Sequence, residues 1–256
     1  MQEHISDNVS PSLEKYIGVS LVDLVTKRLR HDIYTGKYKP GQKLVVRKLS
    51  EDLNVSHTPI KDALNRLVAE GYVIVQPRKS MIVRECTNRQ FIESMQLRFI
   101  IEVSCAKDFL EAAEKDPAKI EEMEQYQQLQ ADLVSIDDID FEAWITYGGK
   151  FHDAYMRTAK NHQMYATYKM LDTNRNSYFA YMKNAGFPFM RQRILQDAEG
   201  HVNIITAMRQ NNLPALQKAL AHHILDVCSD YLIDDDAKRA YAQFETYLNL
   251  YSFQAD

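Results

Sequence analysis

The stretch LSEDLNVSHTPIKDALNRLVAEGYVIVQP, residues 49–77, constrains the fold of this chain more than any other. It indicates two short helices joined by a tight turn and followed by a strand. Ser56 or Thr58 can cap the second helix, and Pro59 suits its first turn, where N–H groups lack partners within the helix. The stretch is either a plain surface turn or a helix-turn-helix motif, and the flanking sequence decides between them.

The flanking sequence completes a winged helix-turn-helix. Apolar residues recur at helical spacing after Ser20, which predicts a helix that ends at GKYKPG. VRKLSEDLNVS predicts a short helix ending near Asn54, and the next helix is expected from about Pro59 to Glu70. YVIVQ and SMIVREC are rich in β-branched residues and predict a hairpin, with PRKS at its turn.

Basic residues lie where such a fold would contact DNA. One helix can enter the major groove, while its neighbours and the wing contact phosphates. Residues 15–84 hold 14 Lys and Arg against 6 Asp and Glu, whereas residues 85–256 hold 17 against 26. Each basic residue alone is equally well explained as a solvated surface charge, but the set in this order favours DNA binding. The predicted contacts are Arg47, Lys48, Ser56, His57, Thr58, Lys61, Arg66, Arg78 and Lys79.

After residue 87 the sequence indicates helices almost throughout. Residues 88–113 carry apolar side chains every three or four positions, and DPAK then restarts a helix. Further helices are predicted at 118–135, 139–159, 161–184, 187–211, 213–233 and 236–250. Gly148-Gly149 interrupts the second of them, and two later stretches rich in Gly, Pro or Asn separate others. The predicted fold is mainly α: a flexible tail (1–15), a winged helix-turn-helix (16–86) and an all-helical bundle of six or seven helices (87–256).

The composition excludes several classes of protein. A hydrophobic content of 45% with 26% charged residues fits a soluble globular chain. A membrane span needs a run of about 18 apolar residues, which the sequence lacks, and its N-terminus lacks the layout of a signal peptide. Three cysteines at wide, irregular spacing fit neither a disulfide framework nor a zinc site. We therefore expect a cytoplasmic protein with no membrane partner.

The front segment resembles the GntR family of bacterial transcription regulators. The pattern P-G-x-x-L, L-S, V-S-x-T-P, A-L and R-L-x-x-E-G is present from Pro40 to Gly71. The departures concern side chains that read DNA: His57 replaces the usual arginine, and Lys61-Asp62 replaces an arginine-glutamate pair. Lysine keeps the charge but loses the bidentate fork that reads guanine. The resemblance therefore implies retained phosphate contacts and an operator sequence of its own.

The remainder resembles the C-terminal FCD domain of the FadR-type branch of that family. Arg98 and Glu102 match R-x-x-x-E, and FHDAYMRTAKN and EGHVNIITAMRQNNLPALQKALAHHI match later motifs. The family's metal is held by Asp-x-x-x-His and two later histidines, whose positions here are His152, His201 and His223.

The aspartate position is Gly148. Asp153 or Glu142 could substitute for that ligand. Alternatively, the histidines could be ordinary core or surface residues. The resemblance implies a divalent metal, zinc first, with nickel or manganese as alternatives.

The resemblance also implies an effector, a small carboxylate that meets the metal and an arginine. The candidates for contacting it are Arg98, Asn161 and Arg175. An ion pair with Glu102, four residues on, is the alternative role of Arg98.

The predicted function is a transcription regulator that binds double-stranded operator DNA as a homodimer under the control of a small carboxylate, and not an enzyme. Two alternatives stay open. The bundle could only dimerise, having lost metal and effector sensing. Less favoured is a three-histidine metal-dependent enzyme, because the sequence offers no general base near those histidines and the DNA reader would be unexplained.

Overall fold

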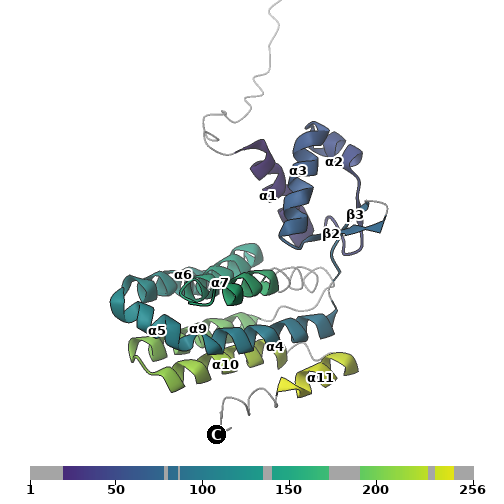
Figure 1. Ribbon diagram of the computed structural model, residues 1–256. Coiled ribbons are helices and arrows are strands. Elements are labelled where there is room, and N and C mark those ends of the chain that lie inside the picture. The colour runs from purple at the N-terminus through teal and green to yellow at the C-terminus, as the bar shows by residue number, and fades with distance from the viewer. Residues whose placement is uncertain are drawn as a thin grey trace, which may run out of the picture.

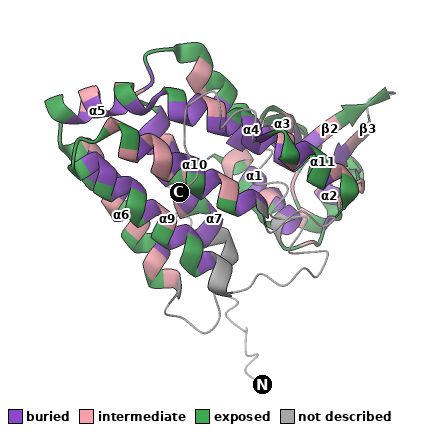
Figure 2. Ribbon diagram, turned by 90° about the horizontal axis from the view of Figure 1, so that it is seen from below, coloured by how far each residue is buried: buried purple, intermediate pink, exposed green. Residues whose placement is uncertain are grey.

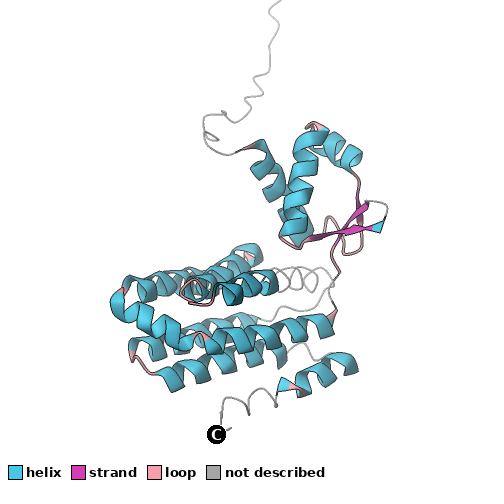
Figure 3. Cartoon of the chain, viewed as in Figure 1, coloured by secondary structure: helices cyan, strands magenta, loops and turns pink. Residues whose placement is uncertain are grey.

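The computed structural model describes residues 20–77, 80–85, 87–134, 140–172, 191–229 and 234–244. Figure 1 shows a small unit of helices and strands joined to a larger helical unit by the segment after the last strand. The strands of the described chain all lie in the small unit (Figure 3). The mainly α fold with an N-terminal winged helix-turn-helix is confirmed. Every helix in the described ranges is too short or too polar to cross a membrane.

The small unit is a three-helix cluster with a three-stranded sheet. Strand order is β1-β3-β2 with antiparallel neighbours, and Val73 of β2 faces Val83 of β3. The hairpin is confirmed, but β1 was not predicted, because two residues give no alternation to read. The elements are α1 (Leu21–Tyr34), β1 (Lys43–Leu44), α2 (Val46–Leu53), α3 (His57–Ala69), β2 (Val73–Gln76) and β3 (Ser80–Val83).

The turn between α2 and α3 is built by Asn54 and Ser56. Asn54 ends α2 with a left-handed backbone at φ 51°, a conformation that asparagine tolerates better than most residues. Ser56 is the N-cap of α3, although its side chain makes no capping hydrogen bond. The helix begins at His57, two residues before the predicted start at Pro59. Proline is accommodated because the first turn of a helix has no internal partners for its N–H groups.

The core of the small unit lies between α1 and α3. Leu29 of α1 and Leu64 of α3 are completely buried there. At the surface Arg66 of α3 forms an ion pair with Asp23 of α1. Hydrogen bonds from Ser20 and Arg66 lower the pKa of Asp23 from 3.8 to about 2.

The larger unit contains α4 (Asn88–Ser104), α5 (Ala106–Lys115), α6 (Ala118–Val134), α7 (Phe141–Met156), a helix over 162–172, α9 (Arg191–Arg209), α10 (Leu213–Ser229) and α11 (Asp235–Ala242). The helix predicted over 88–113 is wrong in its continuity, because the chain bends at Cys105 into α4 and α5. Gly148-Gly149 does not interrupt α7, since packing against neighbouring helices overrides the low helix propensity of glycine.

Helix α4 is the centre of the larger unit. It packs against α10 and α11, while α6 packs against α7 and α9. Buried residues run along α4 (Figure 2) and include Phe91, Met95 and Phe99. They also include Arg98 and Glu102. A helix buried on most faces must give every charged side chain a partner within the protein.

Replacement of Phe99 should reveal how much this packing stabilises the bundle. Phe99 is 0% exposed and meets the ring of Phe244 edge-on at 5.9 Å, so Phe99→Ala should lower the free energy of unfolding by about 3–5 kcal/mol. Leu97 on the same helix is 48% exposed, and Leu97→Ala should change it by less than about 0.5 kcal/mol. Urea denaturation followed by circular dichroism measures both; equal losses would contradict the assigned packing.

Candidate metal centre and nucleic-acid interface

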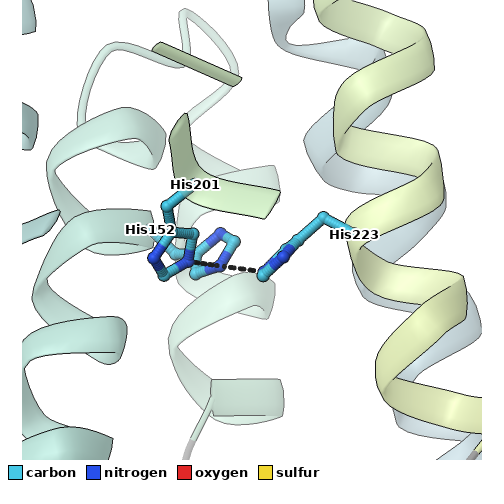
Figure 4. Close-up of side chains that lie close together, drawn as sticks. All are labelled: His152, His201 and His223. Atoms are coloured by element: carbon cyan, nitrogen blue, oxygen red, sulfur yellow. Dashed lines mark hydrogen bonds between the residues drawn. The ribbon is translucent and has the colours of Figure 1, made fainter. Parts of the chain in front are cut away.

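Three histidine side chains from three different helices converge in the interior of the bundle. His152 comes from α7, His201 from α9 and His223 from α10, and their rings point toward one another (Figure 4). The Nε2 atom of His152 lies 3.0 Å from that of His223 and 3.3 Å from that of His201. All three residues are buried. The sequence prediction that these three histidines meet is confirmed.

The distances fit a shared metal ion. Zinc–nitrogen bonds of 2.0–2.1 Å at tetrahedral angles place ligand atoms about 3.3 Å apart. The two Nε2–Nε2 separations of 3.0 and 3.3 Å are close to that value. Three imidazoles favour zinc or a similar late divalent ion. The donor set and its geometry therefore suit a divalent metal.

Neighbouring residues hold the rings in place. The ring of Phe151 stacks on His201 with centroids 3.9 Å apart. His223 lies against Gly200 of α9, where a Cβ would come within 2.5 Å of its Nδ1 atom. Glycine at position 200 therefore permits the approach of His223. The sequence reading did not identify Gly200, because the neighbour that needs the space lies on another helix.

Glu102 fixes the orientation of His152. Its Oε2 atom lies 2.8 Å from Nδ1 of His152, and the hydroxyl of Tyr155 donates to its backbone carbonyl at 2.6 Å. The carboxylate accepts the Nδ1 proton, which leaves a lone pair on Nε2 facing the other two histidines. This is the tautomer that a metal ligand requires.

The other oxygen of Glu102 binds Arg98. Arg98 donates from Nε to Oε1 at 2.7 Å, and both side chains are almost completely buried. Burial opposes the charged form, but Glu102 together with Tyr168 and Asp172 raises the pKa of Arg98 above its ordinary value. The guanidinium also lies over the ring of Tyr168, 5.4 Å from its centroid. The ion pair predicted as the alternative role of Arg98 is confirmed.

A groove between α9 and α10 reaches one of the three histidines, His223, from outside. It encloses about 640 Å³. His222 on its wall is exposed, whereas His223 extends from the groove into the metal centre. The polar residues of the lining include Glu199, Asn203, Lys218 and Asp226. His222 therefore lies outside the cluster of His152, His201 and His223.

Most of the predicted DNA contacts that the structure describes lie on the surface around the starts of α2 and α3. The side chain of Arg47 is 81% exposed and pairs with Glu51 at 3.1 Å. Arg66 is half exposed but is engaged by Asp23 of α1. Arg78 and Lys79 lie outside the described residues. The remaining contacts are all exposed: Lys48, Ser56, His57, Thr58 and Lys61.

Comparison with known families decides the identity. The family described as "Bacterial regulatory proteins, gntR family" matches residues 21–83, and the FCD domain matches residues 93–226, which is more than half of the chain. The chain belongs to the GntR family of regulators. It is a transcription regulator with an FCD domain, and the proteins and families it matches are regulators and not enzymes.

The HTH-type transcriptional regulator McbR of Escherichia coli is 34% identical over 122 residues, which cover 47% of this chain and 55% of McbR. The chain thus aligns with about half the length of that relative. The solved structure of E. coli McbR/YncC has a TM-score of 0.66 at 22% identity, covering 83% of this chain and 97% of that one. A GntR regulator from Rhodococcus sp. RHA1 has a TM-score of 0.64 at 19% identity, covering 82% and 97%. These structures show the shared fold.

This GntR regulator lacks the aspartate that the FCD pattern places at residue 148. The side chain of Gln130 occupies that space, because a Cβ at Gly148 would lie 2.8 Å from its Nε2 atom. Asp153 does not take the ligand's place: its carboxylate accepts from Tyr165 at 3.0 Å and from Lys169 at 2.9 Å. The side chain of Glu142 is outside those described.

The residues predicted to contact an effector do not lie together in this FCD domain. Arg98 is linked to the histidines through Glu102. Asn161 is exposed and caps the helix over 162–172, accepting from the backbone of Gln163 at 3.0 Å and of Met164 at 3.3 Å. That local role explains its amide, so we do not include it in the metal centre. Arg175 lies outside the described part of the chain.

Loss of Glu102 should destabilise this FCD domain. Glu102→Ala leaves Arg98 charged and buried without its partner, which should lower the free energy of unfolding by about 3–5 kcal/mol. Glu102→Gln, which keeps one oxygen acceptor, should lower it less. Glu93 forms an exposed pair with Arg89 on the same helix, so Glu93→Ala should leave the urea midpoint of metal-stripped protein unchanged. Equal midpoints for Glu102→Ala and wild type would refute this role.

Proposed function

We propose that this regulator binds operator DNA as a homodimer and that its FCD domain senses a small carboxylate through a bound divalent metal, zinc being the first candidate. The observation that carries the proposal is the convergence of three buried imidazoles with Nε2 atoms 3.0 and 3.3 Å apart. A bundle that only dimerised would have no need of three buried imidazoles at one point. Functionally the chain divides near residue 86, between the DNA-binding unit and the sensor.

The surface around α3 supports DNA binding. The N-terminal part of α3 carries exposed imidazole, hydroxyl and ammonium groups in His57, Thr58 and Lys61. Arg47 projects from the start of α2 and is available to a phosphate oxygen, since its exposed pair with Glu51 is weak. Arg66 is engaged differently, because it forms an ion pair with Asp23 of α1.

A dimer follows from the way such proteins read DNA. One recognition helix covers one half-site, and two half-sites lie about 34–36 Å apart along the duplex. Two-fold symmetry of the protein then matches the symmetry of the operator. Such a protein works where the chromosome is, which for a bacterial regulator is the cytoplasm.

A carboxylate effector suits the chemistry of the site. A divalent ion held by neutral imidazoles keeps positive charge and open positions for an oxygen ligand. Arg98 adds a second positive charge, joined to His152 through Glu102. The groove at His223 offers the effector a route from solvent toward the proposed metal.

Regulation requires that the effector bind one arrangement of the DNA-binding units more tightly than another. An effector with equal affinity for both would leave the equilibrium between them unchanged.

Substitution of the exposed basic residues tests DNA binding. Arg47→Ala and Lys61→Ala should each weaken binding to a duplex selected from a random pool. Each should also lower the slope of log affinity against log salt concentration by about one, which corresponds to the loss of one phosphate contact. Lys107 on α5 is 72% exposed and lies in the sensor, so Lys107→Ala controls for loss of charge. Fluorescence anisotropy over a salt series measures the affinities. Unchanged affinity in both variants would contradict the proposed interface.

Substitution of the histidines tests the metal centre. His201→Ala should lower the metal content of purified protein below that of wild type, because it removes one of three converging ligands. His222→Ala alters an adjacent but exposed imidazole and should leave the content unchanged. Elemental analysis measures both proteins after dialysis. Equal metal content in His201→Ala and wild type would remove His201 from the ligand set.

Carboxylate sensing has its own measurement. Small mono- and dicarboxylates should raise the melting temperature of metal-loaded protein and leave metal-stripped protein unchanged, because the oxygen ligand needs the ion. Equal shifts in both forms would contradict binding at the metal.

A further inference from the structure

We propose that Asp197 of α9 is the fourth protein ligand of the metal, replacing the carboxylate that the FCD pattern supplies from position 148. The inference rests on the proposed metal centre and adds a ligand that the family pattern does not place there. Asp197 is four residues before His201, so both side chains lie on the same face of α9. The Asp-x-x-x-His pair missing from α7 is thus present on α9.

The position of Asp197 fits this role. Its side chain is buried, and Oδ1 lies 3.8 Å from Nε2 of His223. Ligand atoms around a zinc ion lie about 3.3 Å apart, so Oδ1 lies about half an ångström beyond ligand spacing from His223. The effector would then take a fifth position, since zinc can expand from four ligands to five. Of the three histidines, His223 is the one that Asp197 directly approaches, and one helical turn separates Asp197 from His201.

Gln130 holds the other oxygen of this carboxylate. Its Nε2 atom donates to Oδ2 of Asp197 at 3.1 Å and to the backbone carbonyl of Trp144 at 3.3 Å. Gln130 is itself 1% exposed. A carboxylate that is anchored through one oxygen and presents the other matches the way outer residues orient metal ligands.

Gly148 makes the arrangement possible. A Cβ at that position would lie 2.8 Å from the Gln130 amide nitrogen, so a larger residue would displace the group that positions Asp197. The absence of an acid at position 148 and the presence of Asp197 are therefore coupled. The same space can hold either a ligand from α7 or the amide that directs a ligand from α9.

The other acids near the histidines are engaged differently. Glu102 binds Nδ1 of His152, the nitrogen away from the converging Nε2 atoms, and pairs with Arg98. Asp153 is held by Tyr165 and Lys169. With Asp197 as the one carboxylate ligand, a divalent centre keeps a single positive charge. A monocarboxylate effector would neutralise that charge.

The affinity of metal-stripped, full-length protein for Zn²⁺ tests the proposal by competition with a chelator. Asp197→Ala should weaken binding by more than the roughly 10–100-fold that loss of an outer residue costs. Asp197→Asn preserves an oxygen for Gln130 but removes the negative charge, and should weaken binding as well. Asp153→Ala is the matched control, an acid beside His152 that should have no effect. Co²⁺ absorption should change in both Asp197 variants, because the ligand set around the ion changes.

Restoring the family arrangement provides an independent check. In the Asp197→Ala background, the pair Gln130→Ala and Gly148→Asp should recover Zn²⁺ affinity, since the first change opens the space for the second. Gln130→Ala alone should weaken binding less than Asp197→Ala. Circular dichroism and the melting temperature of the stripped proteins establish that each variant folds.

The outcomes separate this proposal from the metal centre itself. If wild type and His201→Ala both lack tight Zn²⁺ binding, the metal centre fails. If wild type binds Zn²⁺, His201→Ala does not, and Asp197→Ala matches wild type in affinity and Co²⁺ spectrum, only the role of Asp197 is overturned. An affinity for Asp197→Asn equal to wild type would likewise assign Asp197 a structural role.

Discussion

The carboxylate of Glu102 lies wholly inside the protein, between the guanidinium of Arg98 and the imidazole of His152. The charge depends on Arg98, because removal of the guanidinium leaves an uncompensated charge away from water. His152 satisfies the second oxygen with a hydrogen bond. The FCD domain depends on this link. It holds α4 and α7 together, sets the tautomer of His152 and connects the candidate metal to the arginine expected to meet an effector.

In the proposed metal centre, the carboxylate ligand has moved from α7 to α9 while the three histidines are kept. The Nε2 atoms converge because Gly200 lets His223 approach α9, and Phe151 stacks on His201. Glycine at position 148 admits Gln130, whose amide holds Asp197 beside His223. A family pattern read at one position would register only a missing acid.

Much of the fold could be predicted because local patterns dictate it. Helical spacing of apolar residues marked most helices, and β-branched runs marked the wing. The elements that the sequence predicted wrongly or missed also have local causes. β1 is too short to show a period, and the bend at Cys105 lies within an unbroken apolar pattern. Gly148-Gly149 indicated a break, yet packing of α6 against α7 keeps the helix continuous.

The sequence by itself determined the family, the order of the two units, the exposed basic residues at the start of α3 and the three histidines, since each depends on short-range spacing or on residue type. Only the tertiary structure decided which acid lies near those histidines. Glu102, Gln130 and Asp197 come from three helices, and their neighbours depend on packing distances of a few ångströms. Sequence spacing carries no information on such distances between helices.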